Sequence, residues 1–199
     1  MATNRELKAE QTREKLYESA LTLINEKGYE NVSVEDITKA AGVAKGTFYT
    51  HFDSKENLLY YTYIHLNSCY TKALEKAEKE EVFFDVFDTF VFESYKEIAK
   101  LGKNVLQALG TNMFTKESRD AFLDKDRGLY TSLRYLIEKG IEEGLIDKSQ
   151  KPEDLIDNFA AMVIGVESFW SLSDSDEDLP SFAHRCFGTM LAGFIKKDQ

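Results

Sequence analysis

Apolar residues recur three and four positions apart along most of the chain, which is the spacing of amphipathic helices. The first such pattern covers residues 11–27, and Gly28 ends it at a position typical of a helix C-terminus. Residues 1–10 are polar and are expected to form an arm ahead of this helix. With only two Pro and eleven Gly among 199 residues, long helices are expected throughout. The pattern predicts an all-α fold.

Two short helices joined by a tight turn are predicted next. Ser33 is a good N-cap, and Asp36 three residues later completes a capping box. Gly42 provides the backbone conformation that a turn between crossing helices requires. The second helix is predicted over residues 45–51, with Phe48 facing inward. This arrangement is a helix-turn-helix, and a longer helix follows it.

The outer side of the second short helix carries a cation, hydroxyls and a phenol but few carboxylates, which suits the DNA major groove. Lys45 and Thr47 are expected to reach bases or nearby phosphates. Phosphate contacts, which position the protein without reading sequence, are expected from other side chains. The candidate DNA-binding residues are Ser33, Lys45, Gly46, Thr47, Tyr49, Thr50, His51 and Lys55, of which Tyr49, His51 and Lys55 are the expected phosphate contacts.

This region resembles the DNA-binding head of the TetR family of bacterial transcriptional repressors. Thr38 and Ala44 depart from the common pattern, and without a Ser at position 44 the second helix lacks a side-chain cap worth about 1 kcal/mol. The resemblance implies that Tyr49 and Lys55 hold the DNA backbone. The matching residues are Gly28, Val34, Ile37, Ala41, Gly42, Val43, Lys45, Gly46, Thr47, Phe48, Tyr49, His51, Phe52, Lys55, Glu56, Asn57, Leu58 and Leu59.

Six further helices are predicted after the helix-turn-helix. The sequence divides into a DNA-binding domain at 1–54 and a helical ligand-binding and dimerisation domain at 55–199. The helix at 152–170 is apolar on two faces and must be covered on both sides. We therefore expect a homodimer through 152–170 and 179–196, and the resemblance implies a four-helix bundle of these helices with their twins. The six predicted helices span 55–77, 81–101, 104–109, 119–143, 152–170 and 179–196.

The net charge of −10 is unusual for a DNA-binding protein. Residues 1–55 contain eight Lys/Arg and nine Asp/Glu, whereas residues 56–199 contain 17 and 26. The acidity therefore belongs to the second part of the chain. A nearly neutral head predicts weak, salt-sensitive non-specific DNA binding, which a dimer compensates by doubling the phosphate contacts. A two-fold dimer predicts a pseudo-palindromic operator in double-stranded DNA.

Catalytic chemistry has little support in the sequence. The three His residues have no Cys, His or acidic partner at metal-ligand spacing, and no nucleotide-binding or nucleophile motif is present. No catalytic residues, metal or cofactor are therefore expected, and the chain is not expected to be an enzyme. Cys69 and Cys186 are interpreted as two separate structural thiols.

Aromatic residues are abundant in the second domain. Most are expected in the core, but together they can line a pocket between helices, with Asn158 or Glu167 as polar groups. The resemblance implies that this region binds a small effector, which the lining predicts to be partly apolar. The candidate pocket residues are Tyr63, Phe87, Met113, Phe114, Tyr130, Met162 and Trp170.

Cellular location follows from what the sequence lacks. No run is expected to approach the length of a membrane span, and the N-terminus has no apolar signal segment, so no membrane association and a cytoplasmic location are expected. The resulting interpretation is a dimeric, ligand-responsive repressor. The alternatives are an adaptor of the same fold that recruits a protein partner without an inducer, and an enzyme on a helical scaffold.

Overall fold

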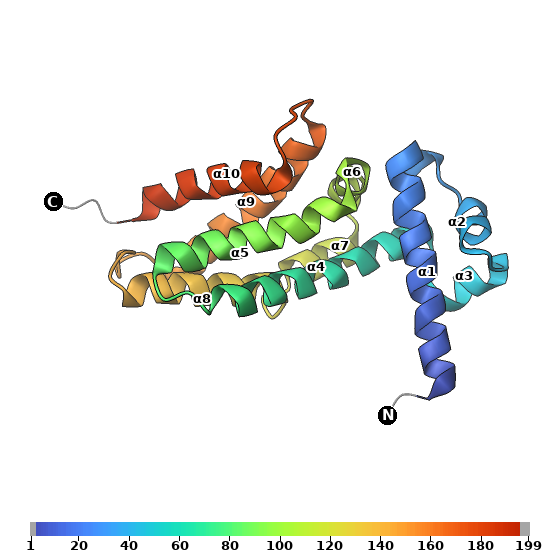
Figure 1. Cartoon of the computed structure of the whole chain (residues 1–199), viewed down its shortest axis with the longest axis horizontal. Coiled ribbons are helices and arrows are strands. Elements are labelled where there is room, and N and C mark those ends of the chain that lie inside the picture. The colour runs from blue at the N-terminus through green and yellow to red at the C-terminus, as the bar shows by residue number, and fades with distance from the viewer. Residues whose placement is uncertain (1–2, 196–199) are drawn as a thin grey trace.

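A computed structural model describes residues 3–195, which fold into ten α-helices and two short 3₁₀ helices. Helices α1–α3 form a head, and helices α4–α10 form an elongated body beside it (Figure 1). The all-α prediction is confirmed. The helices are α1 (Asn4–Lys27), α2 (Val34–Ala41), α3 (Lys45–His51), α4 (Lys55–Ala77), α5 (Phe83–Ile98), α6 (Lys103–Asn112), α7 (Lys116–Leu123), α8 (Gly128–Glu142), α9 (Pro152–Leu172) and α10 (Leu179–Phe194), with 3₁₀ turns η1 (Tyr29–Asn31) and η2 (Ala99–Leu101).

Helix α1 begins earlier than predicted. The side chain of Thr3 accepts a hydrogen bond from the backbone of Glu6, and the Glu6 carboxylate accepts one from the Thr3 backbone. This capping box satisfies N-terminal amide groups and starts the helix at Asn4, so the prediction of a polar arm over residues 1–10 was wrong for residues 4–10. Met1 and Ala2 lie outside the described residues.

The helix-turn-helix forms as predicted. Ser33 and Asp36 form the capping box at the start of α2, and Gly42 ends that helix in the left-handed region, with φ of 65°. Helix α3 has no side-chain cap at Ala44, in agreement with the sequence. The fully buried Phe48 anchors the inner side of α3 in the head core.

Helix α4 belongs to both parts of the molecule. Ser54 caps it, and its first turns pack into the head, where Tyr61 meets Tyr17 edge to face with ring centroids 5.3 Å apart. Its later turns pack against α5 and α8 in the body. Head and body are therefore joined by one unbroken helix of 23 residues (Figure 1).

The predicted helix over 119–143 is divided into two. Helix α7 ends at Leu123, and α8 starts at Gly128, where it crosses α4 closely. A Cβ atom at Gly128 would lie 2.5 Å from the carbonyl oxygen of Asn67. Only glycine permits this approach, so the first residue of α8 can lie directly against the backbone of α4.

Other boundaries move by a few residues. Helix α5 starts later than predicted and continues into η2, and α6 runs through Gly110 to Asn112 instead of stopping at Leu109. Pro152 occupies the first turn of α9, as predicted. The predicted end of the last helix at Lys196 lies outside the described residues.

Helix α9 requires a correction to the membrane expectation. It has 21 residues and a window of mean hydropathy 1.3, so it is long and apolar enough to cross a membrane by composition. It instead packs against α6, α8 and α10 inside the body, and 44% of that window is buried there. A core helix covered on several sides explains the same composition.

Candidate DNA-binding surface and effector cavity

The outer side of α3 is open to solvent. Tyr49 is 51% exposed although its ring packs edge to face on the buried Phe48. Thr50 donates a hydrogen bond to the carbonyl of Gly46, so its hydroxyl is held against the helix. Among the candidate DNA-binding residues, Ser33, Lys45, Gly46, Tyr49 and Thr50 are exposed, and Thr47, His51 and Lys55 are half-buried.

Gly46 has no packing role among the described residues. A Cβ atom at this position would meet no atom within 4 Å, and the residue lies in the second position of a helix that gains nothing from glycine. Glycine inside a helix costs about 0.5–1 kcal/mol relative to alanine. The open space on the outer side of α3 is therefore available to an external partner that approaches the backbone.

The cations of this surface already have partners within the head. The Lys45 ammonium group pairs with the carboxylate of Glu35, and this hydrogen bond lowers the pKa of Glu35 and raises that of Lys45. Lys55 donates to the carbonyls of Tyr29 and Val32, at 2.8 and 3.0 Å. An ammonium group has three N–H donors, so Lys55 retains one for an outside acceptor.

Ser33 is also occupied. Its hydroxyl donates to the Asp36 carboxylate at 2.6 Å and accepts from the Asp36 amide at 3.1 Å. These bonds lower the pKa of Asp36. Ser33 therefore fixes the N-terminus of α2 beside α3 in this structure.

A small cavity of about 20 Å³ lies inside the body between α4, α6 and α9. It holds about one water-sized molecule. It lies between α4, which runs from the head into the body, and α6, which contacts α1 of the head. Its lining residues are Tyr63, Leu66, Tyr70, Leu106, Leu109, Gly110, Met113, Phe122, Arg127, Val163, Ile164, Glu167 and Ser168.

Polar groups converge on this otherwise apolar cavity. The Tyr70 hydroxyl donates to the Glu167 carboxylate at 3.2 Å, and Tyr63 donates to the carbonyl of Leu109 at the same distance. Burial raises the pKa of Glu167 to about 7, against a smaller opposing effect of the Tyr70 hydrogen bond. Arg127 is only 6% exposed, and its Nε atom has no hydrogen-bond partner among the residues that the structure describes.

Sequence reasoning located this cavity only in part. Of the seven candidate pocket residues, Tyr63 and Met113 line it. Phe114 lies on the surface with 85% exposure, and the Trp170 indole donates to the carbonyl of Glu177. The remaining candidates, Phe87, Tyr130 and Met162, lie outside the lining. Glu167 was proposed as a polar group, but Arg127 was missed because its Asp-Lys-Asp-Arg-Gly context is typical of an exposed turn.

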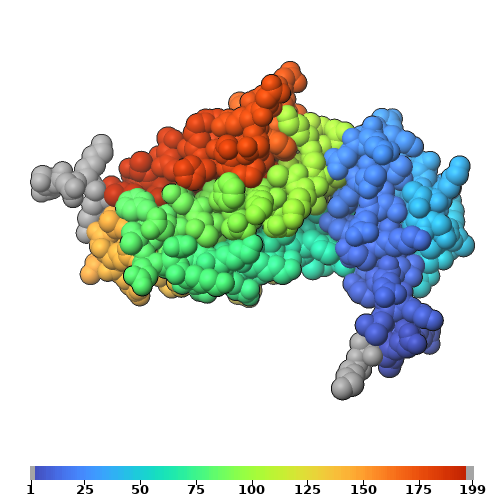
Figure 2. Space-filling view, viewed as in Figure 1, coloured from blue at the N-terminus to red at the C-terminus, as the bar shows by residue number. Residues whose placement is uncertain are grey.

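A second junction joins head and body beside the cavity. The Asn25 side chain of α1 donates to the carbonyl of Leu101 at 2.5 Å, and the Asn104 side chain of α6 donates to the carbonyl of Asn25 at 2.7 Å. Gly102 between them has φ of 81°, and a Cβ there would lie 2.4 Å from the Asn25 side-chain oxygen. Figure 2 shows the end of α1 lying against α6.

An apolar stripe lies exposed along α9 and α10. Phe169 and Leu172 are 70% and 74% exposed, and Phe169 stacks on Phe182 of α10 with ring centroids 6.2 Å apart. A Cβ atom at Gly165 or Gly193, on the same two helices, would meet no atom of residues 3–195 within 4 Å. The stripe thus combines bare aromatic surface with positions that allow another helix to approach closely.

Within residues 3–195, no group of three or more His, Cys, Asp or Glu side chains is arranged to hold a metal ion. Cys69 and Cys186 are free thiols, and burial raises the pKa of each above its usual value. Thiols that stay protonated in such half-buried positions are poor nucleophiles.

Comparison with known proteins agrees with the geometry of the head. Residues 16–61, which include all of α2 and α3, match the model for bacterial regulatory proteins of the tetR family. A regulator of the helix-turn-helix type from Bacillus subtilis, YvdT, is 27% identical over 192 residues, which are 88% of this chain and 95% of YvdT.

Solved structures share the whole fold. The fatty acid degradation regulator FadR from Bacillus halodurans superposes with a TM-score of 0.76 at 20% identity, over 92% of this chain and 95% of that one. FadR from Thermus thermophilus, a TetR-family repressor solved with lauroyl-CoA, gives a TM-score of 0.69 at 19% identity, over 94% and 97%.

An all-α chain with an exposed recognition helix on a three-helix head is a helix-turn-helix transcriptional regulator and not an enzyme. Residues 16–61 match the TetR family of bacterial regulatory proteins, and the chain as a whole shares its fold with regulators of that family.

Proposed function

We propose that this regulator is a cytoplasmic, dimeric repressor that leaves a pseudo-palindromic operator when a small, partly apolar molecule binds in the body. Residues 1–54 are the proposed DNA-binding domain, and residues 55–199 are the proposed ligand-binding and dimerisation domain. The observation that carries this proposal is the position of the cavity. Its walls come from α4 and α6, and each of these helices also contacts the head.

A ligand larger than the present cavity must move its walls. The 20 Å³ space is far smaller than the ~300–1,000 Å³ of a typical ligand pocket. Displacing α6 shifts the Asn104–Asn25 bond, and tilting α4 moves the head directly. Binding then favours the arrangement in which the two heads no longer match the operator, to the extent that the ligand prefers that arrangement.

The dimer is proposed to form through α9 and α10. The stripe of the exposed Phe169 and Leu172 and the half-buried Phe182 is apolar, and burying such surface contributes about 25 cal/mol per Å². A second copy of the chain covers it by the same stripe, as two-fold symmetry requires. Two heads held this way contact half-sites about 34–36 Å apart on one face of the duplex.

The relatives support a ligand-responsive repressor. The Thermus thermophilus FadR is a repressor captured with lauroyl-CoA, which has a long apolar chain. The apolar lining of the cavity in the present protein, including Leu66, Leu109 and Val163, fits a ligand with an apolar part. The adaptor function remains the competing proposal, because it uses the same fold without a ligand.

The test begins with footprinting of the DNA upstream of the chain's own gene, which identifies the operator. A thermal-shift screen then finds ligands, because a ligand that binds the folded state stabilises it. Calorimetry measures the affinity of each ligand with and without operator. We expect operator DNA to weaken ligand binding by about 5–150-fold. The ligand should weaken operator binding by the same factor. Equal affinities for every ligand would favour the adaptor.

A further inference from the structure

Arg127 is a buried cation without a charged partner at contact distance. It precedes α8, its Nε is buried without a hydrogen bond, and no carboxylate among the described residues lies within 4 Å. The guanidinium stacks over the Phe122 ring at 4.5 Å, which offsets only part of the cost of burial. A buried charge with an unused donor is costly unless something supplies the missing acceptor.

The small cavity beside Arg127 can hold this acceptor. Arg127, Glu167 and Ser168 all line the small cavity, and Ser168 also lines an open groove of about 300 Å³ between α6 and α9. Leu106 and Gly110 are likewise common to both spaces. The small cavity and the groove therefore lie on either side of the same three residues, and the groove is large enough for the body of a small ligand.

We propose that the cavity binds the head group of an apolar monocarboxylate, whose carboxylate accepts a hydrogen bond from Arg127 and whose apolar part lies in the groove between α6 and α9. This inference deepens, and rests on, the effector site proposed above. A carboxylate matches the planar guanidinium and neutralises its charge. The apolar residues at the junction, such as Leu106, favour a hydrocarbon chain beyond the head group.

Glu167 makes the binding depend on pH. The groups that face it are Tyr63 and Tyr70 of α4, Tyr95 of α5 and Arg127. Its own pKa is already raised to about 7 by burial, and a second carboxylate nearby disfavours its charge further. The ligand anion is therefore bound together with a proton on Glu167. The affinity for the ligand anion therefore falls as pH rises above 7, by at most about tenfold per pH unit.

The test uses decanoate, its neutral analogue decanamide and its cationic analogue decylamine, titrated into the full chain by calorimetry without DNA. We expect decanoate to bind at least tenfold more tightly than decanamide at pH 6.5, and decylamine not to compete. Equal binding of decanoate and decanamide, or preferential binding of decylamine, would overturn the carboxylate assignment.

Four variants locate the binding site. Arg127→Met should lose at least tenfold in decanoate affinity, and Glu167→Gln should keep binding while removing its pH dependence. Gly110 lines both the cavity and the groove, so Gly110→Leu should fill the space between them and block the ligand. Gly110→Ala should not block it, since the alanine Cβ would lie an ordinary 3.6 Å from the Ser168 hydroxyl. Circular dichroism and melting confirm folding, and the two Gly110 variants keep the test valid if Arg127→Met does not fold. Undiminished binding to Arg127→Met or Gly110→Leu would contradict the site.

A separate operator titration distinguishes this inference from the proposed function. If decanoate binds as described and operator affinity does not change, the ligand assignment stands and the inducer function fails. If decanoate does not bind while another molecule releases the operator, the function stands and the carboxylate assignment is overturned.

Discussion

The ammonium group of Lys45, the first residue of α3, is paired with the carboxylate of Glu35 in the first turn of α2. Both side chains are more than half exposed, so the pair contributes little to stability. Its effect is on the surface itself. The Glu35 carboxylate, which lies beside α3, repels DNA phosphates. It also competes with them for the ammonium group of Lys45.

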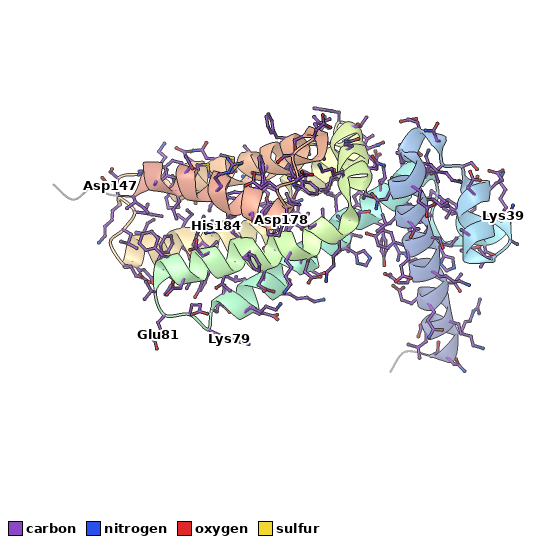
Figure 3. The ribbon with its side chains drawn as sticks, turned by 45° about the horizontal axis from the view of Figure 1, so that its top comes forward. Lys39, Lys79, Glu81, Asp147, Asp178 and His184 are labelled. Carbon is purple, nitrogen blue, oxygen red and sulfur yellow. The ribbon has the colours of Figure 1, made fainter. Side chains whose placement is uncertain are left out.

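Removing this carboxylate is expected to strengthen DNA binding. Glu35→Gln frees Lys45 and deletes one negative charge, so affinity for any duplex should rise several-fold at low salt and less at high salt. Fluorescence anisotropy with operator and random DNA measures both. Glu81→Gln is the matched control, because Glu81 lies at the opposite end of the body from Lys39 of the head (Figure 3). Equal effects of the two variants would show that net charge alone is responsible.

The junction at Gly102 is expected to be sterically intolerant. Gly102→Ala places a Cβ at 2.4 Å from the Asn25 side-chain oxygen and must also adopt a positive φ. Gly144→Ala is the control, since Gly144 has a similar φ of 77° but no atom within 4 Å of the added Cβ. Urea unfolding should show Gly102→Ala to be less stable than Gly144→Ala, by roughly 1–3 kcal/mol. Equal losses would mean that Asn25 simply moves aside.

Glu167 is expected to make stability depend on pH. Its folded pKa of about 7 lies above its usual 4.5, so between these values the folded protein holds a proton that the unfolded chain has released. The contribution of Glu167 to the free energy of unfolding therefore falls as pH rises from about 4.5 to 7. Glu167→Gln, measured by urea unfolding at several pH values, should flatten this slope and be more stable than wild type at pH 8. The exposed Glu138→Gln should leave the slope unchanged.

The exposed stripe on α9 and α10 is expected to hold the dimer together. Phe169→Glu places a charge where an apolar surface must be buried, and should convert the dimer to a monomer. Leu123→Glu is the control, because Leu123 is also exposed but belongs to α7. Sedimentation velocity at micromolar concentration measures the state of each variant. A wild-type monomer, or a Phe169→Glu dimer, would contradict the proposed interface.

Local signals in the sequence predicted the head well. Ser33, Asp36 and Gly42 act through neighbours three or four positions away, so their capping and turn roles can be recognised without knowing the fold. The long-range features could not be predicted in this way. The close crossing of α8 over α4 depends on Gly128 meeting the Asn67 carbonyl, a contact between helices distant in the chain.

The cavity was the hardest feature to predict for the same reason. Helical spacing shows that Tyr63 and Phe87 face inward, but it does not show which inward residues border empty space. Arg127 lies among charged neighbours that suggest a solvated turn, and its burial results from the packing of α7 and α8 around it. Only the assembled body brings Arg127 and Glu167 to one cavity.

The central claim is that α3 binds operator DNA, and one titration tests it most directly. Operator affinity is measured by gel shift at fixed salt for wild type, Thr47→Ala and Tyr49→Ala. Both side chains lie on the outer half of α3, where truncation leaves the buried Phe48 in place. Each substitution is predicted to weaken operator binding about tenfold or more, at about 1–3 kcal/mol per lost contact, while helicity and melting temperature stay near those of wild type. Wild-type affinity in both variants would contradict the assignment of α3 as the recognition helix.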